Sequence, residues 1–187
     1  MRYIAFLQGI NVGGRHVIKM ADLQLLFAGC GFTNVQTYIQ SGNVVFDADG
    51  AEAALRHRIE QAFESRFSFR SSIALRTEAE LAELLDGYPF SPEEIAATEA
   101  ADPAVEHTYV YLAADTPGPA AALALPQTGS GGDRIALHGR DVYLLCGRSV
   151  RNSKAAAALG KLGVPHTARN LRTLRKVLAL SQGTPKP

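Results

Sequence analysis

The chain has 187 residues, of which 47% are hydrophobic, and a formal net charge of +1, values typical of a globular protein with a buried core. It contains no run of about 20 apolar residues, which excludes a membrane-spanning helix, and we expect a cytoplasmic protein with no membrane partner. Cys30 and Cys146 are too isolated for a disulfide framework or a zinc site.

The first part of the sequence predicts the order strand, helix, strand, strand, helix, strand. A continuous apolar run opens the chain, as in a strand covered on both faces, and alternating and helical apolar spacings follow it. The predicted elements are a strand at 3–7, a helix at 20–27, two antiparallel strands at 35–39 and 44–46 joined by a turn, a helix at 55–63 and a strand at 72–75.

The second part repeats this alternation after two polar connections. Thr77 and Glu80 have capping-box spacing, which predicts the start of a further helix. Residues 87–106 are acidic and contain prolines, and residues 117–133 are rich in Gly, Pro and Ser, so both predict surface connections. Beyond them the pattern predicts strands at 108–112, 135–137 and 142–145, helices at 153–162 and 171–180, and a frayed tail from residue 181.

An internal sequence similarity relates the two parts. A shift of 93 positions aligns Arg76 with Arg169 and Thr77 with Asn170, and each pair precedes a helix with leucine spacing. Chance matching is the alternative. Together with the order of the predicted elements, this similarity predicts an α+β fold of two ferredoxin-like, split βαβ halves with antiparallel sheets and helices on one face. The expected division is an N-terminal half at 1–86, an acidic connection at 87–106, a C-terminal half at 107–182 and a tail at 183–187.

Charge is strongly polarised along the chain. Residues 77–133 hold 11 acids and no Lys or Arg, whereas residues 134–187 hold 11 Lys or Arg and one acid, Asp141. Such separation can create a cationic face that attracts phosphates, nucleotides or nucleic acid. The alternative is that the two blocks neutralise each other within the fold or across a homo-oligomer.

The segment from Gly9 to His16 is rich in glycine and follows the first predicted strand. Gly9 and Gly14 have the separation found in a P-loop, but Arg15 and His16 replace its lysine and hydroxyl residue, so a P-loop NTPase is excluded. Glycines let backbone N–H groups approach an anion closely. Alternatively, they serve a turn that needs positive φ.

Several ordered strings carry a family resemblance. They are FLQGINVGG at 6–14, KMADL at 19–23, TYIQSGNVVF at 37–46, Arg76-Thr77, YPF at 88–90, Ser153-Lys154 and TARN at 167–170. Over nearly the whole chain these resemble the signatures of DUF1697, a family of unknown function. The resemblance implies an α+β fold with ferredoxin-like halves and no established activity. Gln8 stands where the family usually has arginine, and Leu171 where it often has tryptophan. If that arginine binds the ligand, we expect weaker or different binding here.

The polar residues shared with the family pattern form the site hypothesis. If the halves pack face to face, Arg76 and Arg169 would flank one cleft, each beside a helix N-terminus that favours an anion. Arginine offers the bidentate fork that phosphate and carboxylate recognition uses. The alternatives are pairing of these arginines with the acidic segment, and capping or turn roles for the polar residues. The candidate ligand-binding residues are Asn11, Gly13, Gly14, Lys19, Gln40, Ser41, Asn43, Arg76, Arg169 and Asn170.

His16 and His166 adjoin these segments and are the candidate acid/base residues, with ordinary loop histidines as the alternative. Neither Ser41 nor Ser153 lies in a G-x-S-x-G elbow, and the histidines lack ligand spacing, so we expect no covalent catalysis, no metal and no cofactor. The leading hypothesis is binding of a phosphorylated or otherwise anionic small molecule. An enzyme acting on such a ligand, a nucleic-acid-binding protein and a self-associating module are the alternatives.

Overall fold

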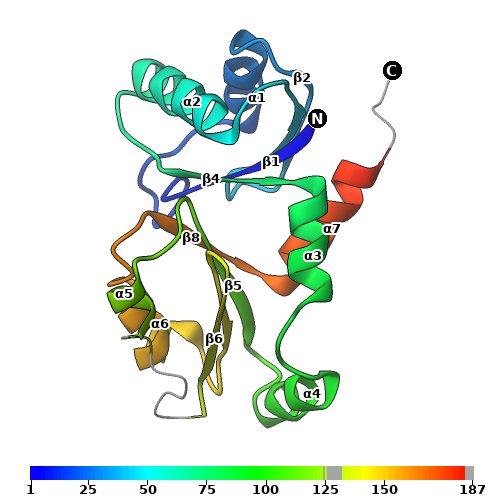
Figure 1. Ribbon diagram of the computed structural model, residues 1–187, viewed down its shortest axis with the longest axis vertical. Helices are drawn as coiled ribbons and strands as arrows, with labels where there is room; N and C mark the ends of the chain where they lie inside the picture. The colour runs from blue at the N-terminus through cyan, green and yellow to red at the C-terminus, as the bar shows by residue number, and fades with distance from the viewer. Residues whose placement is uncertain (124, 126–131, 184–187) are drawn as a thin grey trace. The chain divides into compact units, whose positions relative to one another are not determined.

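The structure is a computed structural model that describes residues 1–123, 125 and 132–183. The chain forms two compact units. Unit 1 comprises Met1–Glu83 and Arg175–Pro187, and unit 2 comprises Leu84–Leu174. Each unit contains a four-stranded antiparallel sheet (Figure 1).

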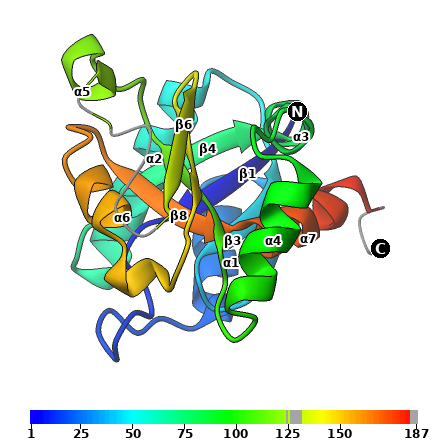
Figure 2. The same cartoon turned by 90° about the horizontal axis from the view of Figure 1, so that it is seen from below.

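Unit 1 has the element order predicted from its sequence. Its sheet has the order β2-β3-β1-β4, so β3 lies between the two strands joined by α1, as in a split βαβ unit. Figures 1 and 2 show β1 and β4 side by side. The elements are β1 (Arg2–Leu7), α1 (Met20–Gly29), β2 (Thr33–Tyr38), β3 (Asn43–Asp47), α2 (Glu52–Phe67), β4 (Ile73–Thr77) and α3 (Glu78–Asp86), the last crossing into unit 2.

The core of unit 1 forms where α1 and α2 cover one face of the sheet (Figure 1). Strand side chains alternate between faces, so Tyr3, Ala5 and Leu7 of β1 face the helices together with residues of β3 and β4. The helices contribute Leu23, Leu26, Phe27, Leu55, Ile59 and Phe63. The intervening Ile4 and Phe6 are also fully buried, which explains why β1 is a continuous apolar run.

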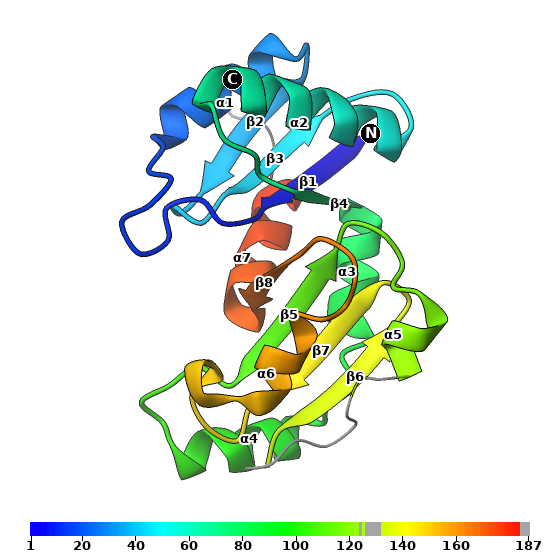
Figure 3. The ribbon, with the colours of Figure 1, turned by 90° about the vertical axis from the view of Figure 1, so that its left-hand side faces the viewer.

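Unit 2 repeats this topology. Its sheet order, β6-β7-β5-β8, matches that of unit 1 strand for strand. Figure 3 shows α6 in front of β5 and β7. Leu159 of α6 belongs to the same buried hydrophobic cluster as Tyr111 and Leu144 of the sheet. The elements are α4 (Pro92–Ala101), β5 (Thr108–Ala113), α5 (Pro119–Leu123), β6 (Arg134–His138), β7 (Asp141–Leu145), the 3₁₀ helix η1 (Val150–Asn152), α6 (Lys154–Leu159), β8 (His166–Asn170) and α7 (Leu171–Gln182), the last crossing into unit 1.

The predicted α+β fold with two ferredoxin-like halves is therefore confirmed. The domain boundaries expected from the sequence remain a prediction. The compact units themselves divide inside α3 and α7. In the predicted acidic connection, residues 92–101 form α4, which begins with a capping box between Ser91 and Glu94 and with Pro92 in its first turn. Part of the second predicted connection, residues 124 and 126–131, lies outside the described residues.

The predicted caps at the ends of β4 and β8 are present. The Thr77 N–H and hydroxyl donate to Glu80 Oε2 at 2.7 and 3.0 Å, and the Glu80 N–H donates to Thr77 Oγ1 at 3.1 Å. At the start of α7, the Thr173 N–H donates to Asn170 Oδ1 at 2.8 Å. Thr77 and Asn170 thus satisfy backbone donors that a helix start leaves exposed. Among the described residues, no helix combines the length and apolar character needed to cross a bilayer.

Candidate functional site

The glycine-rich segment after β1 folds back on itself as a small hairpin. Val12 and Arg15 pair as an antiparallel bridge, and the Asn11 N–H donates to His16 O at 3.1 Å. Gly13 and Gly14 form its tip with φ of 58° and 74°, the positive values that a two-residue hairpin turn requires. The alternative reading of these glycines, a turn that needs positive φ, is thus confirmed. Within the described ranges, the N–H groups of the two exposed glycines donate to no protein acceptor.

Asn11 fastens this hairpin to the turn between β2 and β3. Its Nδ2 donates to Gln40 O at 2.8 Å and to Ile18 O at 3.2 Å, while its Oδ1 accepts from the Ile18 N–H at 2.8 Å. Asn11 itself has a φ of 54°. Because both ends of the amide are used, its role in the structure is to hold two loops together, and the structure brings Asn11, Gly13, Gly14 and Gln40 into one region of unit 1.

The turn between β2 and β3 is tightly built. Asn43 is fully buried, and its Nδ2 donates to Tyr38 O at 3.0 Å and Ser41 Oγ at 2.9 Å. Ile39, expected in the preceding strand, lies in the turn with a φ of 48° and is 51% exposed. A β-branched residue with positive φ is strained by about 1–2 kcal/mol, and such strain concentrates at functional segments.

Basic residues lie in the hairpin and directly after it in the chain. The segment from Gly9 to Met20 contains no acid, and within the described part of the chain neither Arg15 nor Lys19 makes an ion pair. Lys19 is exposed at the N-cap of α1 and makes no capping hydrogen bond. The His16 ring stacks on Phe69 with centroids 4.2 Å apart, and its Nδ1 lies 3.2 Å from Gly9 O. If Nδ1 carries the proton, Nε2 is left as an acceptor.

Arg76 and Arg169 occupy equivalent positions, the fourth residue of β4 and of β8. Arg76 is 1% exposed and pairs in register with Ile4, whereas the end of β1, Leu7, pairs with Ile73. Three residues of strand, about 10 Å, therefore separate the backbone of Arg76 from the start of the hairpin loop. In unit 2, Arg169 donates to Thr167 Oγ1 at 2.7 Å and Ala168 O at 2.8 Å. Burial lowers the pKa of Arg169 to about 10.

The second candidate acid/base residue, His166, begins β8 in unit 2. Its Nδ1 lies 3.0 Å from Val164 O, and its ring centroid lies 5.7 Å from that of Tyr111. No group of three or more His, Cys, Asp or Glu side chains is placed to hold a metal ion in the described portion of the chain.

A family model described as "Protein of unknown function (DUF1697)" matches residues 1–143 of the chain. The protein belongs to the DUF1697 family. The matched region includes the glycine-rich hairpin, the turn at Gln40 and Arg76, and it ends within β7. No curated protein matches the chain.

The fold of this DUF1697 protein also occurs in a solved structure. The conserved bacterial protein SP0830 from Streptococcus pneumoniae has 21% sequence identity to the chain and a TM-score of 0.68. The match covers 97% of this chain and 98% of SP0830. At this identity, the similarity shows a shared fold.

Sequence reasoning missed two buried polar centres in unit 2 of the DUF1697 protein. Asp133 accepts hydrogen bonds from the Gly147 N–H at 3.0 Å and from Ser153 Oγ at 2.6 Å. Ser153 Oγ also accepts from the Ala156 N–H at 2.9 Å, so Ser153, considered as a nucleophile, is a helix cap. The spacing of Ser153 before an alanine-rich helix was a usable signal for the cap, but nothing in the sequence pointed to Asp133 as its partner.

The other centre is His107, which is 1% exposed and bridges two backbone carbonyls. Nδ1 lies 2.7 Å from Cys146 O and Nε2 lies 2.7 Å from Asp102 O. A neutral imidazole has one N–H group, so donation to both carbonyls requires the protonated ring. Burial lowers the pKa of His107, but the two carbonyls, with Asp102 and Glu99, more than offset this and raise the pKa overall.

We expect the stability of the protein to depend on the protonation of His107. A histidine whose pKa is raised by folding contributes stability below its unfolded pKa of about 6.5, and this contribution is lost as the pH rises through the folded value. Urea denaturation between about pH 5.5 and 8.5 should show a falling free energy of unfolding. His107→Gln should remove this slope, and His57→Gln, at an exposed position of α2, should leave it intact. An unchanged slope in His107→Gln would contradict the bridging role.

Proposed function

We propose that the protein binds a phosphorylated or otherwise anionic small molecule at the tip of the glycine-rich hairpin of unit 1. The ligand contacts are the N–H groups of Gly13 and Gly14 and the side chains of Arg15 and Lys19, with the Gln40 to Asn43 turn as the supporting wall. Arg76, Arg169 and Asn170 remain predicted site residues on which this proposal does not depend.

The observation that carries the proposal is the placement of Lys19. An N-cap favours a side chain that accepts a hydrogen bond, and the positive end of the helix dipole disfavours a cation. Lys19 makes no capping bond and no ion pair with the described residues, so helix stability does not explain it. An anion held beside it would remove the electrostatic conflict.

The size of the site favours a small ligand. Two cations that make no ion pair with the described residues, together with two backbone donors, can satisfy one phosphate or carboxylate group, because a charged oxygen accepts several short hydrogen bonds. The hairpin is held by Asn11 to the neighbouring turn, so its donors are ordered before the ligand arrives. A pre-ordered site loses less conformational entropy on binding.

Titration of the isotope-labelled protein with inorganic phosphate and adenosine monophosphate, followed by amide chemical shifts, tests the proposal. We expect saturable shifts at Gly13, Gly14 and Arg15. The double variant Arg15→Gln with Lys19→Gln should weaken binding about tenfold or more, since each lost hydrogen bond to a charged group is worth about 1.5–3 kcal/mol.

The matched control is Arg175→Gln with Lys176→Gln, two exposed positions of α7 in unit 1 with the same change in charge. This control should bind as the unmodified protein does. Equal weakening in both double variants would show that net charge alone attracts the ligand, and shifts confined to other regions would place the site elsewhere.

A further inference from the structure

A second group of exposed cations lies on the connection between β7 and α6 in unit 2 and at the first residue of α6. Arg148, Arg151 and Lys154 recur every third residue around η1, and all three are exposed. None of them forms an ion pair with the described residues. We propose that this basic segment, residues 148–154, binds the phosphate backbone of a nucleic acid.

Hydrogen bonds to a buried carboxylate and within the segment hold its backbone in a defined conformation. Asp133 is 3% exposed and accepts hydrogen bonds from the Gly147 N–H, just before the segment, and from the Ser153 hydroxyl, near its end. Within it, the Asn152 N–H donates to Ser149 O at 2.9 Å and the Ser153 N–H donates to Val150 O at 3.2 Å. Val150 packs on the core of unit 2. The backbone is therefore ordered while the three cationic side chains extend into solvent.

The fold does not require cations at this position. The equivalent connection of unit 1, between β3 and α2, consists of residues 48–51 and carries an acid, Asp49, and no Lys or Arg. Lys154 is the first residue of α6, where the helix dipole favours an acid over a cation. The charge of the basic segment therefore serves something other than the stability of the unit.

The chemistry of the segment selects among anionic partners. A membrane surface would require apolar side chains for insertion beside the cations, and the large exposed hydrophobic residues of the described chain all lie outside this segment. One small anion could not contact all three cations, because they are spread over seven residues. A nucleic-acid strand offers successive phosphates, and arginine binds phosphate through its planar fork. With contacts to phosphate alone, binding carries no sequence preference.

Fluorescence anisotropy with a labelled single-stranded oligonucleotide, measured as a function of salt, tests this inference on the full chain. Three phosphate contacts predict a slope of log K against log salt of about −2, and each contact contributes about −0.7. The triple variant Arg148→Gln, Arg151→Gln and Lys154→Gln should lose most of this slope and bind about tenfold or more weakly at low salt.

Two controls separate this inference from general charge effects and from the small-ligand site. Arg172→Gln, Arg175→Gln and Lys176→Gln remove three other exposed cations and should retain binding. Arg15→Gln with Lys19→Gln should also retain oligonucleotide binding, even where phosphate binding is lost. If the triple variant is misfolded by circular dichroism, Lys154→Gln alone should reduce the slope by about 0.7.

Three results would overturn the inference. Equal losses in the basic-segment variant and in the α7 variant would show that net charge attracts the oligonucleotide. No binding at low salt would show that the segment has no nucleic-acid affinity. Equal affinity for a polyglutamate peptide, lost in the same variant, would identify the partner as an acidic protein.

Discussion

Replacing Gly42 with alanine is expected to destabilise unit 1 by about 3 kcal/mol. Gly42 has a φ of +76°, a conformation that costs an L-residue about 1–2 kcal/mol. An added Cβ would lie 2.7 Å from Ile10 Cδ1 and 2.9 Å from Leu7 Cβ. The Ile10 methyl can rotate away, but Leu7 Cβ is fixed to the backbone of β1. Overpacking of this kind adds about 1–3 kcal/mol.

Urea denaturation followed by circular dichroism measures this loss, and Gly31→Ala is the matched control. Gly31 has a φ of +82° in the same unit, but an added Cβ there would have no atom within 4 Å. The control should therefore show only the conformational cost of about 1–2 kcal/mol. Equal losses in the two variants would contradict the proposed close contact between the turn and β1.

The Gly42 variant also bears on the proposed ligand site. The Leu7 N–H donates to Gly42 O at 2.8 Å, and Asn11 binds the adjacent Gln40 O, so moving the turn away from β1 would move the wall of the hairpin. We expect any phosphate binding at Gly13 and Gly14 to weaken together with stability. The substitution leaves the charges of Arg15 and Lys19 in place. Weaker binding in this variant would therefore come from displacement of the supporting turn and not from loss of charge.

The sequence was sufficient for the features of the fold that depend on local periodicity. The run at residues 3–7 predicts a strand buried on both faces because every side chain in it is apolar, and β1 has this character. Thr77 and Glu80 predict a cap because both groups of a capping box lie within four residues. The alignment of Arg76 with Arg169 predicts two related halves, and both residues occupy the same position in equivalent strands.

The features that depend on distant residues could not be predicted. The glycine-rich segment fits either an anion-binding loop or a turn that needs positive φ, and only the pairing of Val12 with Arg15 shows that Gly13 and Gly14 form a hairpin turn. Asp133 lies 20 residues from the hydroxyl of Ser153 that it binds, a separation at which no local pattern exists. The helix α4 was missed for a different reason, since its acidic composition outweighed a readable cap at Ser91 and Glu94.

The candidate site was predictable in part. Asn11 and Gln40 were selected by resemblance to a family, and the structure joins them through one hydrogen bond of 2.8 Å. The physical reason, an amide that binds both loops, is visible only in three dimensions. In the sequence, Arg15 marks only the mismatch to a P-loop, whereas in the proposed function its charge beside the glycine tip contacts the ligand.

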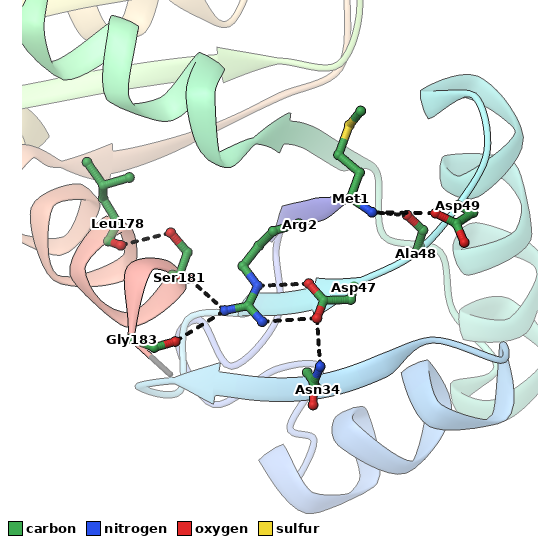
Figure 4. Close-up of polar contacts among 9 residues, drawn as sticks. All are labelled: Met1, Arg2, Asn34, Asp47, Ala48, Asp49, Leu178, Ser181 and Gly183. Carbon is green, nitrogen blue, oxygen red and sulfur yellow. Dashed lines mark hydrogen bonds and ion pairs between the residues drawn. The ribbon is translucent and has the colours of Figure 1, made fainter. Parts of the chain in front are cut away.

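A clamp at Arg2 should hold the end of α7 to β1, and its removal should cost unit 1 about 2 kcal/mol. Figure 4 shows Arg2 paired with both oxygens of Asp47, at 2.8 and 3.0 Å, while its Nη1 donates to Ser181 O at 2.6 Å and to Gly183 O at 3.4 Å. These carbonyls lie at the end of a helix, where unpaired acceptors favour a cation. The Arg2 and Asp47 side chains are only 16% and 26% exposed, so solvent screens the pair weakly.

Arg2→Met should therefore lower the free energy of unfolding and speed hydrogen exchange in the last turn of α7. The matched control is Arg66→Met, which removes an ion pair with Asp22 of similar length, 3.0 Å, whose side chains are 43% and 40% exposed. Exposed pairs contribute about 0–1 kcal/mol. Unchanged exchange in α7 after Arg2→Met would show that the helix end is held by other contacts.

The pH dependence of the clamp follows from Asp47. The hydrogen bond from Arg2 holds the pKa of Asp47 below its usual value, with Asn34 adding a second donor at 2.7 Å. A carboxyl group whose pKa is lowered by folding contributes stability above its unfolded pKa of about 3.9, and loses it as the pH falls through the folded value. The difference in unfolding free energy between the unmodified protein and Asp47→Asn should thus be constant from about pH 7 to 5 and shrink below about pH 4. Because the other carboxyl groups are common to both proteins, their titration cancels in this difference. A difference that stays constant at low pH would mean that the charge of Asp47 does not stabilise the clamp.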